Sequence, residues 1–119
     1  MTRASPRRTR GVGVGVQVTT ELATTRAARR RGLLGRDGID GALVLRPCRQ
    51  VHTIGMRFPI DVAFCARDGR VLRVCRMRPG RVSRLVWRAR FVVEAAAGSF
   101  EQWGVRRGTI VVVRESAGP

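Results

Sequence analysis

Apolar residues in this chain occur in short runs separated by small, polar or charged residues. Between Val12 and Val18, valines alternate with Gly, Gln and Thr, which is the two-residue period of a strand with one buried face. Other runs are continuously apolar and bounded by Gly or Pro, as strands buried on both faces are. We predict strands at residues 12–18, 42–45, 60–66, 71–77, 91–96 and 109–114, with 50–53 as a further candidate and 98–108 as a loop or helical turn.

One short helix is expected after the first strand. Thr24 or Thr25 can cap its N-terminus, and the Ala- and Arg-rich residues that follow favour helix as far as Leu33 or Leu34. Gly32 and Gly35 bracket the predicted end.

Asp68-Gly69 is the clearest hairpin signal, because this dipeptide favours the tight turn between antiparallel strands. A two-residue turn would place Asp61 opposite Arg76 and Cys65 opposite Leu72. Asp61 would then have a cation across the strand pair. Cys65 and Cys75 would point to opposite faces and could not form a disulfide.

Length and composition indicate one folded domain of 119 residues. We expect a basic disordered leader at residues 1–10, a β-rich domain at 11–115 and a tail at 116–119.

No run of 18 apolar residues is present, so we expect no membrane span. The three cysteines are odd in number and contain no C-x-x-C pair, which favours a reducing compartment. The opening residues do not resemble a signal peptide, and we therefore expect a cytoplasmic protein.

Charge is strongly asymmetric, with 24 basic residues, all arginine, against 8 acidic ones and a net charge of +16. The stretch from Arg70 to Arg90 contains Trp87 and no acidic residue. Such a stretch attracts polyanions, and an exposed tryptophan could stack on bases. The alternative is a solvated basic face with Trp87 in the core, because no nucleic-acid-binding motif accompanies the charge. The polyanion-binding candidates are Arg73, Arg76, Arg78, Arg81, Arg84 and Arg88.

Several motifs, taken in their order and spacing, resemble the uncharacterised family known as domain of unknown function 192. They are Arg31-Gly32-Leu33-Leu34-Gly35-Arg36, Val51-His52-Thr53-Ile54-Gly55-Met56, Pro59-Ile60-Asp61-Val62 with Asp68-Gly69, and Val93-Glu94-Ala95-Ala96-Ala97-Gly98 followed by Gly104 and Gly108. The resemblance covers roughly Val16 to Val113. It implies a compact, barrel-like, mostly β domain with one short helix, and no established activity, cofactor or catalytic residue. Many relatives carry a Gly-Leu-Met helix end and a Trp-Met-Lys turn, and this chain departs from both.

Two groups of residues could carry chemistry. His52 with Asp61 and Glu94 could perform acid–base catalysis, although each could equally be satisfied by structural partners, and no nucleophile accompanies them. Cys48, His52 and Met56 offer soft metal ligands. Their spacing in an extended chain, about 13 Å per four residues, is too wide for one ion without a sharp fold-back.

The fold class expected from these patterns is α+β, mostly β, with a barrel-like antiparallel or mixed sheet and one short helix. The leading functional hypothesis is a non-enzymatic module that binds a ligand or partner in a cleft near the His52–Asp61 turn and the Glu94–Gly98 strand end. The alternatives are polyanion or nucleic-acid binding through the basic stretch, and a hydrolase using His52 with Asp61 or Glu94. No catalytic residue, metal or cofactor is assigned, and the pattern specifies no oligomeric state. The ligand-binding candidates are His52, Met56, Arg57, Asp61, Glu94 and Gly98.

Overall fold

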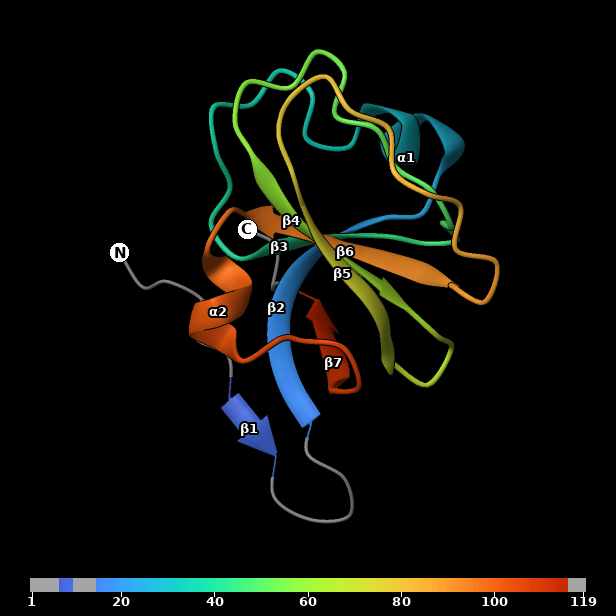
Figure 1. Cartoon of the computed structure of the whole chain (residues 1–119), viewed down its shortest axis with the longest axis vertical. Coiled ribbons are helices and arrows are strands. Elements are labelled where there is room, and N and C mark those ends of the chain that lie inside the picture. Colours follow the sequence, from blue (N-terminus) through green and yellow to red (C-terminus); the bar gives the residue numbers. More distant parts are fainter. Residues whose placement is uncertain (1–6, 10–14, 116–119) are drawn as a thin grey trace.

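The computed structural model describes residues 7–9 and 15–115, which form seven strands and two short helices (Figure 1). The elements are β1 (Arg7–Thr9), β2 (Gly15–Ala23), α1 (Arg26–Arg31), β3 (Ala42–Leu45), β4 (Ile60–Cys65), β5 (Val71–Met77), β6 (Phe91–Ala96), α2 (Ser99–Trp103) and β7 (Ile110–Glu115). The fold is therefore mostly β, as the alternating and apolar runs predict. No helix within the described ranges is long and apolar enough to cross a membrane.

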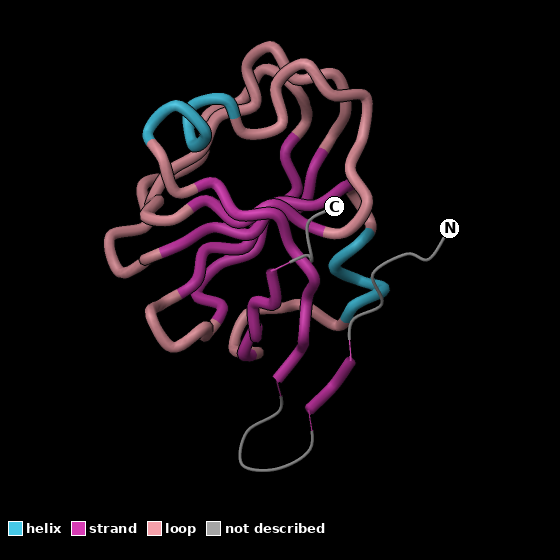
Figure 2. The backbone as a smooth tube through the Cα atoms, turned by 180° about the vertical axis from the view of Figure 1, so that it is seen from behind, coloured by secondary structure: helices cyan, strands magenta, loops and turns pink. Residues whose placement is uncertain are grey.

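The strands form one mixed sheet in the order β1-β2-β3-β6-β4-β5, with β7 also paired to β2. Strand β2 pairs in parallel with both β3 and β7, whereas β6 lies antiparallel between β3 and β4. Figure 2 shows the strands crossing near the centre of the molecule, with loops gathered at one end. The strand order places β6 between β3 and β4, and this position decides where Glu94, the acidic residue of β6, lies.

The barrel expected from the family resemblance is not confirmed, because the sheet is not closed by continuous strand pairing. The edges formed by β5 and β7 meet through an isolated bridge between Arg70, which directly precedes β5, and Ile110 of β7. Backbone hydrogen bonds reinforce it, including Val71 N to Thr109 O at 2.8 Å and Val111 N to Gly69 O at 2.8 Å. The sheet curls so that these edges touch over a short segment only.

The β4–β5 hairpin confirms the predicted pairing at its far end and corrects it near the turn. Asp61 lies opposite Arg76, as expected. Cys65 instead lies opposite Val71, because the register shifts between Phe64 and Cys65 and Leu72 is the extra residue. The turn has three residues, with Gly69 at a positive φ of 93° and its amide bonded to Ala66 O. This geometry is the three-residue loop with a left-handed glycine rather than the two-residue loop.

Helix α1 begins after Thr25, whose side chain accepts a hydrogen bond from Ala28 N at 3.0 Å. It ends at Arg31, shorter than the prediction, because Gly32 follows with a φ of 49°. Helix α2 occupies part of the segment expected as a loop or helical turn. The predicted leader and tail lie outside the described residues, except that residues 7–9 form β1 against β2.

Two groups of buried side chains lie on the two faces of the central strands. Ala63, Cys65 and Val93 belong to one group, which α2 completes through Phe100. Val62, Phe64 and Val92 belong to the other, which Leu33 joins directly after α1. Because side chains alternate along a strand, neighbouring residues of β4 and β6 enter different groups. This alternation separates the acidic residues considered below.

Candidate functional site

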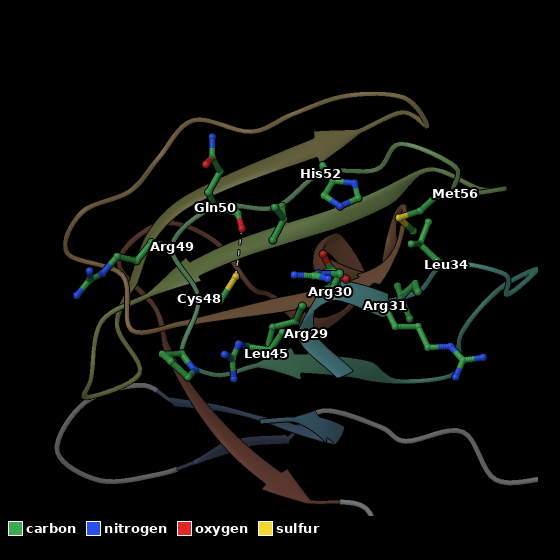
Figure 3. A pocket seen from close by; sticks show the side chains of 15 residues that line it. Arg29, Arg30, Arg31, Leu34, Leu45, Cys48, Arg49, Gln50, His52 and Met56 are labelled. Atoms are coloured by element: carbon green, nitrogen blue, oxygen red, sulfur yellow. Dashed lines mark hydrogen bonds between the residues drawn. The ribbon is translucent and has the colours of Figure 1, made fainter. Parts of the chain in front are cut away.

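A pocket of about 430 Å³ lies between the end of α1, the 45–56 segment and the central strand β6 (Figure 3). Its apolar lining includes Leu33, Leu45, Val51 and Met56, all of which are buried. We call it the α1 pocket. Its full lining is Arg29, Arg30, Arg31, Gly32, Leu33, Leu34, Leu45, Pro47, Cys48, Arg49, Gln50, Val51, His52, Met56 and Glu94.

The end of α1 supplies the basic part of this lining. Arg29, Arg30 and Arg31 form the last turn of the helix, where positive charge is favoured by the helix dipole. Gly32 then turns the chain, and a Cβ at this position would lie 3.7 Å from Glu94 Oε1. The helix end therefore places consecutive arginines beside the pocket and brings the backbone close to the buried carboxyl group.

Thr53 fixes the 51–56 turn that forms the opposite wall. It is fully buried, and its Oγ1 donates to Arg78 O at 2.6 Å and accepts from Arg81 N at 2.9 Å. Its amide donates to Arg81 O at 2.8 Å. These bonds tie the turn to the loop after β5, so that His52 stays exposed and Met56 packs into the pocket lining.

Glu94 is the buried acid of the α1 pocket. It is 3% exposed, and its Oε1 has no hydrogen-bond partner in the part of the chain that the structure describes. Burial raises the pKa of its carboxyl group from 4.5 to about 7, since the charged form loses hydration without gaining a cation. The sequence-based alternative, in which amides near Gly98 satisfy Glu94, is wrong for Oε1. The Gly98 amide donates to Asp61 instead.

Cys48 lines the same pocket as His52 and Met56. The Cys48 thiol donates to Gln50 O at 3.2 Å, and burial raises its pKa. A thiol held in its protonated form is a poor nucleophile and a poor metal ligand. Within the described ranges, no three His, Cys, Asp or Glu side chains are grouped as metal ligands would be.

Three of the six predicted ligand-binding residues, His52, Met56 and Glu94, line the α1 pocket, and three do not. Asp61 accepts hydrogen bonds from Gly98 N at 2.9 Å and Phe100 N at 3.1 Å, and pairs with Arg76 at 3.0 Å. Arg57 pairs with Asp37 at 3.0 Å on the surface. Asp61 and Gly98 thus hold the start of α2, and the structure does not bring Asp61 into the pocket with His52.

The residues predicted from the sequence include none of the four lining arginines, which are Arg29, Arg30, Arg31 and Arg49. The signal was present in three consecutive arginines directly before Gly32. These arginines are distant in sequence from His52 and Glu94, and no local pattern indicates that they meet. The order β3-β6-β4 creates that proximity.

The basic stretch forms a second hollow, of about 350 Å³, next to β5 and the loop that follows it. Five of the six predicted arginines line it, whereas Arg88 does not, and Arg76 is already paired with Asp61 and Glu101. Trp87 is 72% exposed, so the interpretation of Trp87 as a core residue is wrong. Val82 and Leu85 are exposed on the same loop. The lining is Arg73, Cys75, Arg76, Met77, Arg78, Arg81, Val82, Ser83 and Arg84.

Comparison with known proteins supports the fold and gives no activity. A crystal structure of a protein of unknown function from Novosphingobium aromaticivorans is similar, with a TM-score of 0.66 and 20% identity over 76% of this chain and 78% of that one. A Sinorhizobium meliloti protein, named provisionally as a transcription regulator, has a TM-score of 0.65 and 23% identity over 75% and 76%. A search of curated proteins found no match.

The family comparison covers nearly the whole described domain. The model of domain of unknown function 192 (DUF192), described as an uncharacterized ACR, matches residues 8–113. This span includes the end of α1, the 51–56 turn and the Glu94 strand, which carry the motifs noted in the sequence. The chain therefore belongs to the DUF192 family.

Proposed function

We propose that this chain is a non-enzymatic module that binds a small ligand in the α1 pocket. The observation that carries the proposal is Glu94 Oε1, a buried oxygen of the pocket lining that has no hydrogen-bond partner among residues 7–9 and 15–115. Buried polar atoms in native proteins nearly always have a partner. A ligand that reaches Glu94 would supply one.

The rest of the lining supports ligand binding over catalysis. The lining combines buried apolar side chains with converging polar and charged groups, and its volume of about 430 Å³ is in the range of small-molecule sites. An acyl-transfer or hydrolytic reaction would need an activated nucleophile or a base with a positioned partner. Among the described lining residues, the Cys48 thiol is held in its protonated form because burial raises its pKa. Asp61 lies outside the lining and accepts a hydrogen bond at the start of α2. The hydrolase alternative is therefore reduced to His52 with Glu94.

The direct test is a protein-observed NMR titration with a library of fragment-sized acids, amides and amines. We expect shifts at the amides of Leu45, Cys48 and Met56. Gln50→Trp should abolish them by filling the pocket from an exposed position. Gln102→Trp, exposed on α2 and outside the lining, is the matched control. A library that left His52, Met56 and Glu94 unshifted would overturn the proposal.

Polyanion binding by the basic hollow is a second candidate, favoured by the 72% exposure of Trp87 beside Arg84 and Arg88. Charge attracts phosphates, and an exposed indole can stack on an unpaired base. Fluorescence anisotropy with an oligothymidine probe should show binding at ~50 mM salt that weakens steeply by ~200 mM. Trp87→Ala should weaken it, and Arg26→Gln on α1 should not. Absence of binding at the lower salt would reject this candidate.

A further inference from the structure

The ionisable groups that line the α1 pocket are predominantly cationic. Helix α1 contributes Arg29, Arg30 and Arg31, and the loop after β3 contributes Arg49. His52 and Cys48 also face the pocket, and Glu94 is the acid among the described lining residues. Because burial favours the neutral form of that acid, the pocket carries little negative charge below neutral pH.

The four arginines differ in how far they are already engaged. Arg29 donates to the carbonyl oxygens of Thr24 and Arg46, and Arg49 Nε donates to Ala89 O at 3.2 Å. The side chains of Arg30 and Arg31 make no hydrogen bond or ion pair with any residue in the described ranges. Figure 3 shows Arg30 in the middle of the pocket view, whereas Arg31 and Arg49 extend outward. Arg30 lines the pocket with an exposed side chain that no described residue engages, so it is available to the anionic group of a ligand.

From this arrangement we infer that the α1 pocket binds a small organic anion with an apolar body, and that the buried Glu94 carboxyl group contacts its anionic end. The inference rests on the proposed function and adds to it the charge of the ligand and the coupling to pH. Arg30 would neutralise the anionic group, and the apolar body would pack on Leu33, Leu45 and Met56. The protonated carboxyl group would donate its hydrogen to an anion oxygen.

The opposite assignment, a cationic ligand held by an ionised Glu94, is disfavoured by the same geometry. An amine would have to approach past Arg29, Arg30 and Arg31 at the helix end. Like charges in such close contact oppose binding. An anion gains from each of these arginines and is opposed only when Glu94 loses its proton. Its affinity should therefore fall as pH rises through the value at which Glu94 ionises.

The experiment uses two fluorescent probes with almost the same apolar body. They are 8-anilinonaphthalene-1-sulfonate, whose charge is constant near neutral pH, and the uncharged N-phenyl-1-naphthylamine. The wild-type chain should bind the sulfonate roughly tenfold more tightly at about pH 6 than at about pH 8, which is the ratio expected if one group with a pKa of about 7 must be protonated for binding. The uncharged probe should show little pH dependence. Amide shifts at Leu45, Cys48 and Met56 assign the binding to the pocket rather than to the Trp87 loop.

Glu94→Gln removes the proton exchange and keeps a hydrogen-bond donor. It should bind the sulfonate with less than about a twofold difference between the two pH values. His52→Gln is needed as a control, because histidine is the other side-chain type that changes charge near neutral pH. This variant should keep the wild-type pH dependence. Arg30→Gln should weaken sulfonate binding roughly threefold or more and leave the uncharged probe unaffected, while Arg26→Gln changes neither.

The outcomes separate the inference from the proposed function. If neither probe shifts the pocket amides, both fall. If the uncharged probe binds in the pocket but the sulfonate binds no better at about pH 6 than at about pH 8, the inference alone is wrong. The same holds if His52→Gln, rather than Glu94→Gln, removes the pH dependence. The Arg30→Gln comparison tests the anion preference even if Glu94→Gln does not fold.

Discussion

Asp61 and Glu94 lie on adjacent strands but point to opposite faces of the sheet. Asp61 of β4 pairs with Ala95 of β6, whereas Glu94 pairs with Val62. This one-residue offset gives the two acids different roles. Asp61 accepts hydrogen bonds at the start of α2, and Glu94 is buried in the α1 pocket, where no described residue donates a hydrogen bond to its Oε1.

Replacing Asp61 should destabilise the fold. Asp61→Ala leaves the amides of Gly98 and Phe100 without their acceptor, and it also removes the partner of Arg76. We expect a loss of roughly 3 kcal/mol in the free energy of unfolding. Glu101→Gln is the control, because it removes the other acidic partner of Arg76 at an exposed position and should change little. Urea denaturation of both variants measures their free energies of unfolding. An Asp61→Ala chain as stable as the Glu101→Gln chain would contradict the prediction.

Glu94 should make the stability of the fold depend on pH. In the unfolded chain it loses its proton near 4.5, but the folded chain holds that proton up to about 7. Between these values the folded state binds more protons than the unfolded state, so the contribution of Glu94 to stability falls as pH rises. The accumulated cost above neutral pH is about 3 kcal/mol.

Glu94→Gln should remove this contribution. The variant should gain stability relative to the wild type at about pH 8, and it should gain much less at about pH 5. Urea denaturation of both proteins at the two pH values measures the difference, since the other titrating groups are common to both. An equal effect of the substitution at the two pH values would show that Glu94 is not buried as described.

The hairpin glycine should tolerate no side chain. Gly69 has a φ of 93°, and a Cβ there would collide with the carbonyl oxygen of Val111. Gly69→Ala should cost about 3 kcal/mol, because both the backbone strain and the contact between β5 and β7 are affected. Gly80 has a similar φ of 83° with nothing within 4 Å of its Cβ position. Gly80→Ala should therefore show the conformational cost alone, about 1 kcal/mol of the free energy of unfolding. Thermal unfolding of the two variants measures the difference. An equal loss of stability in Gly69→Ala and Gly80→Ala would contradict the prediction.

The three free cysteines should react with thiol reagents at different rates. Cys65 is fully buried, and burial raises the pKa of its thiol to about 12. Cys48 and Cys75 are partly exposed, with smaller increases in pKa from the same cause. Alkylation followed by mass spectrometry should modify Cys48 and Cys75 in the folded chain and Cys65 only after unfolding. Native labelling of Cys65 at the rate of Cys48 would contradict the described core.

The sequence by itself determined most of the strands, because the periodicity of apolar residues is a local property. The runs at 42–45, 71–77 and 91–96 match β3, β5 and β6 residue for residue. The pairing of Asp61 with Arg76 also followed from the hairpin turn alone. The pairing failed at Cys65, since the three-residue turn and the extra Leu72 depend on how Gly69 packs against β7.

Only the tertiary structure decided which side chains share a site. Strand periodicity assigns each residue to one of two faces, but it does not say which strands are neighbours or what covers each face. The order β3-β6-β4 brings Glu94 beneath the end of α1, and the bonds of Thr53 hold the 51–56 turn in the opposite wall. His52, Met56 and Glu94 therefore meet, whereas Asp61 lies on the other face. Contacts between segments distant in sequence depend on the packing of the whole chain, and no local pattern encodes them.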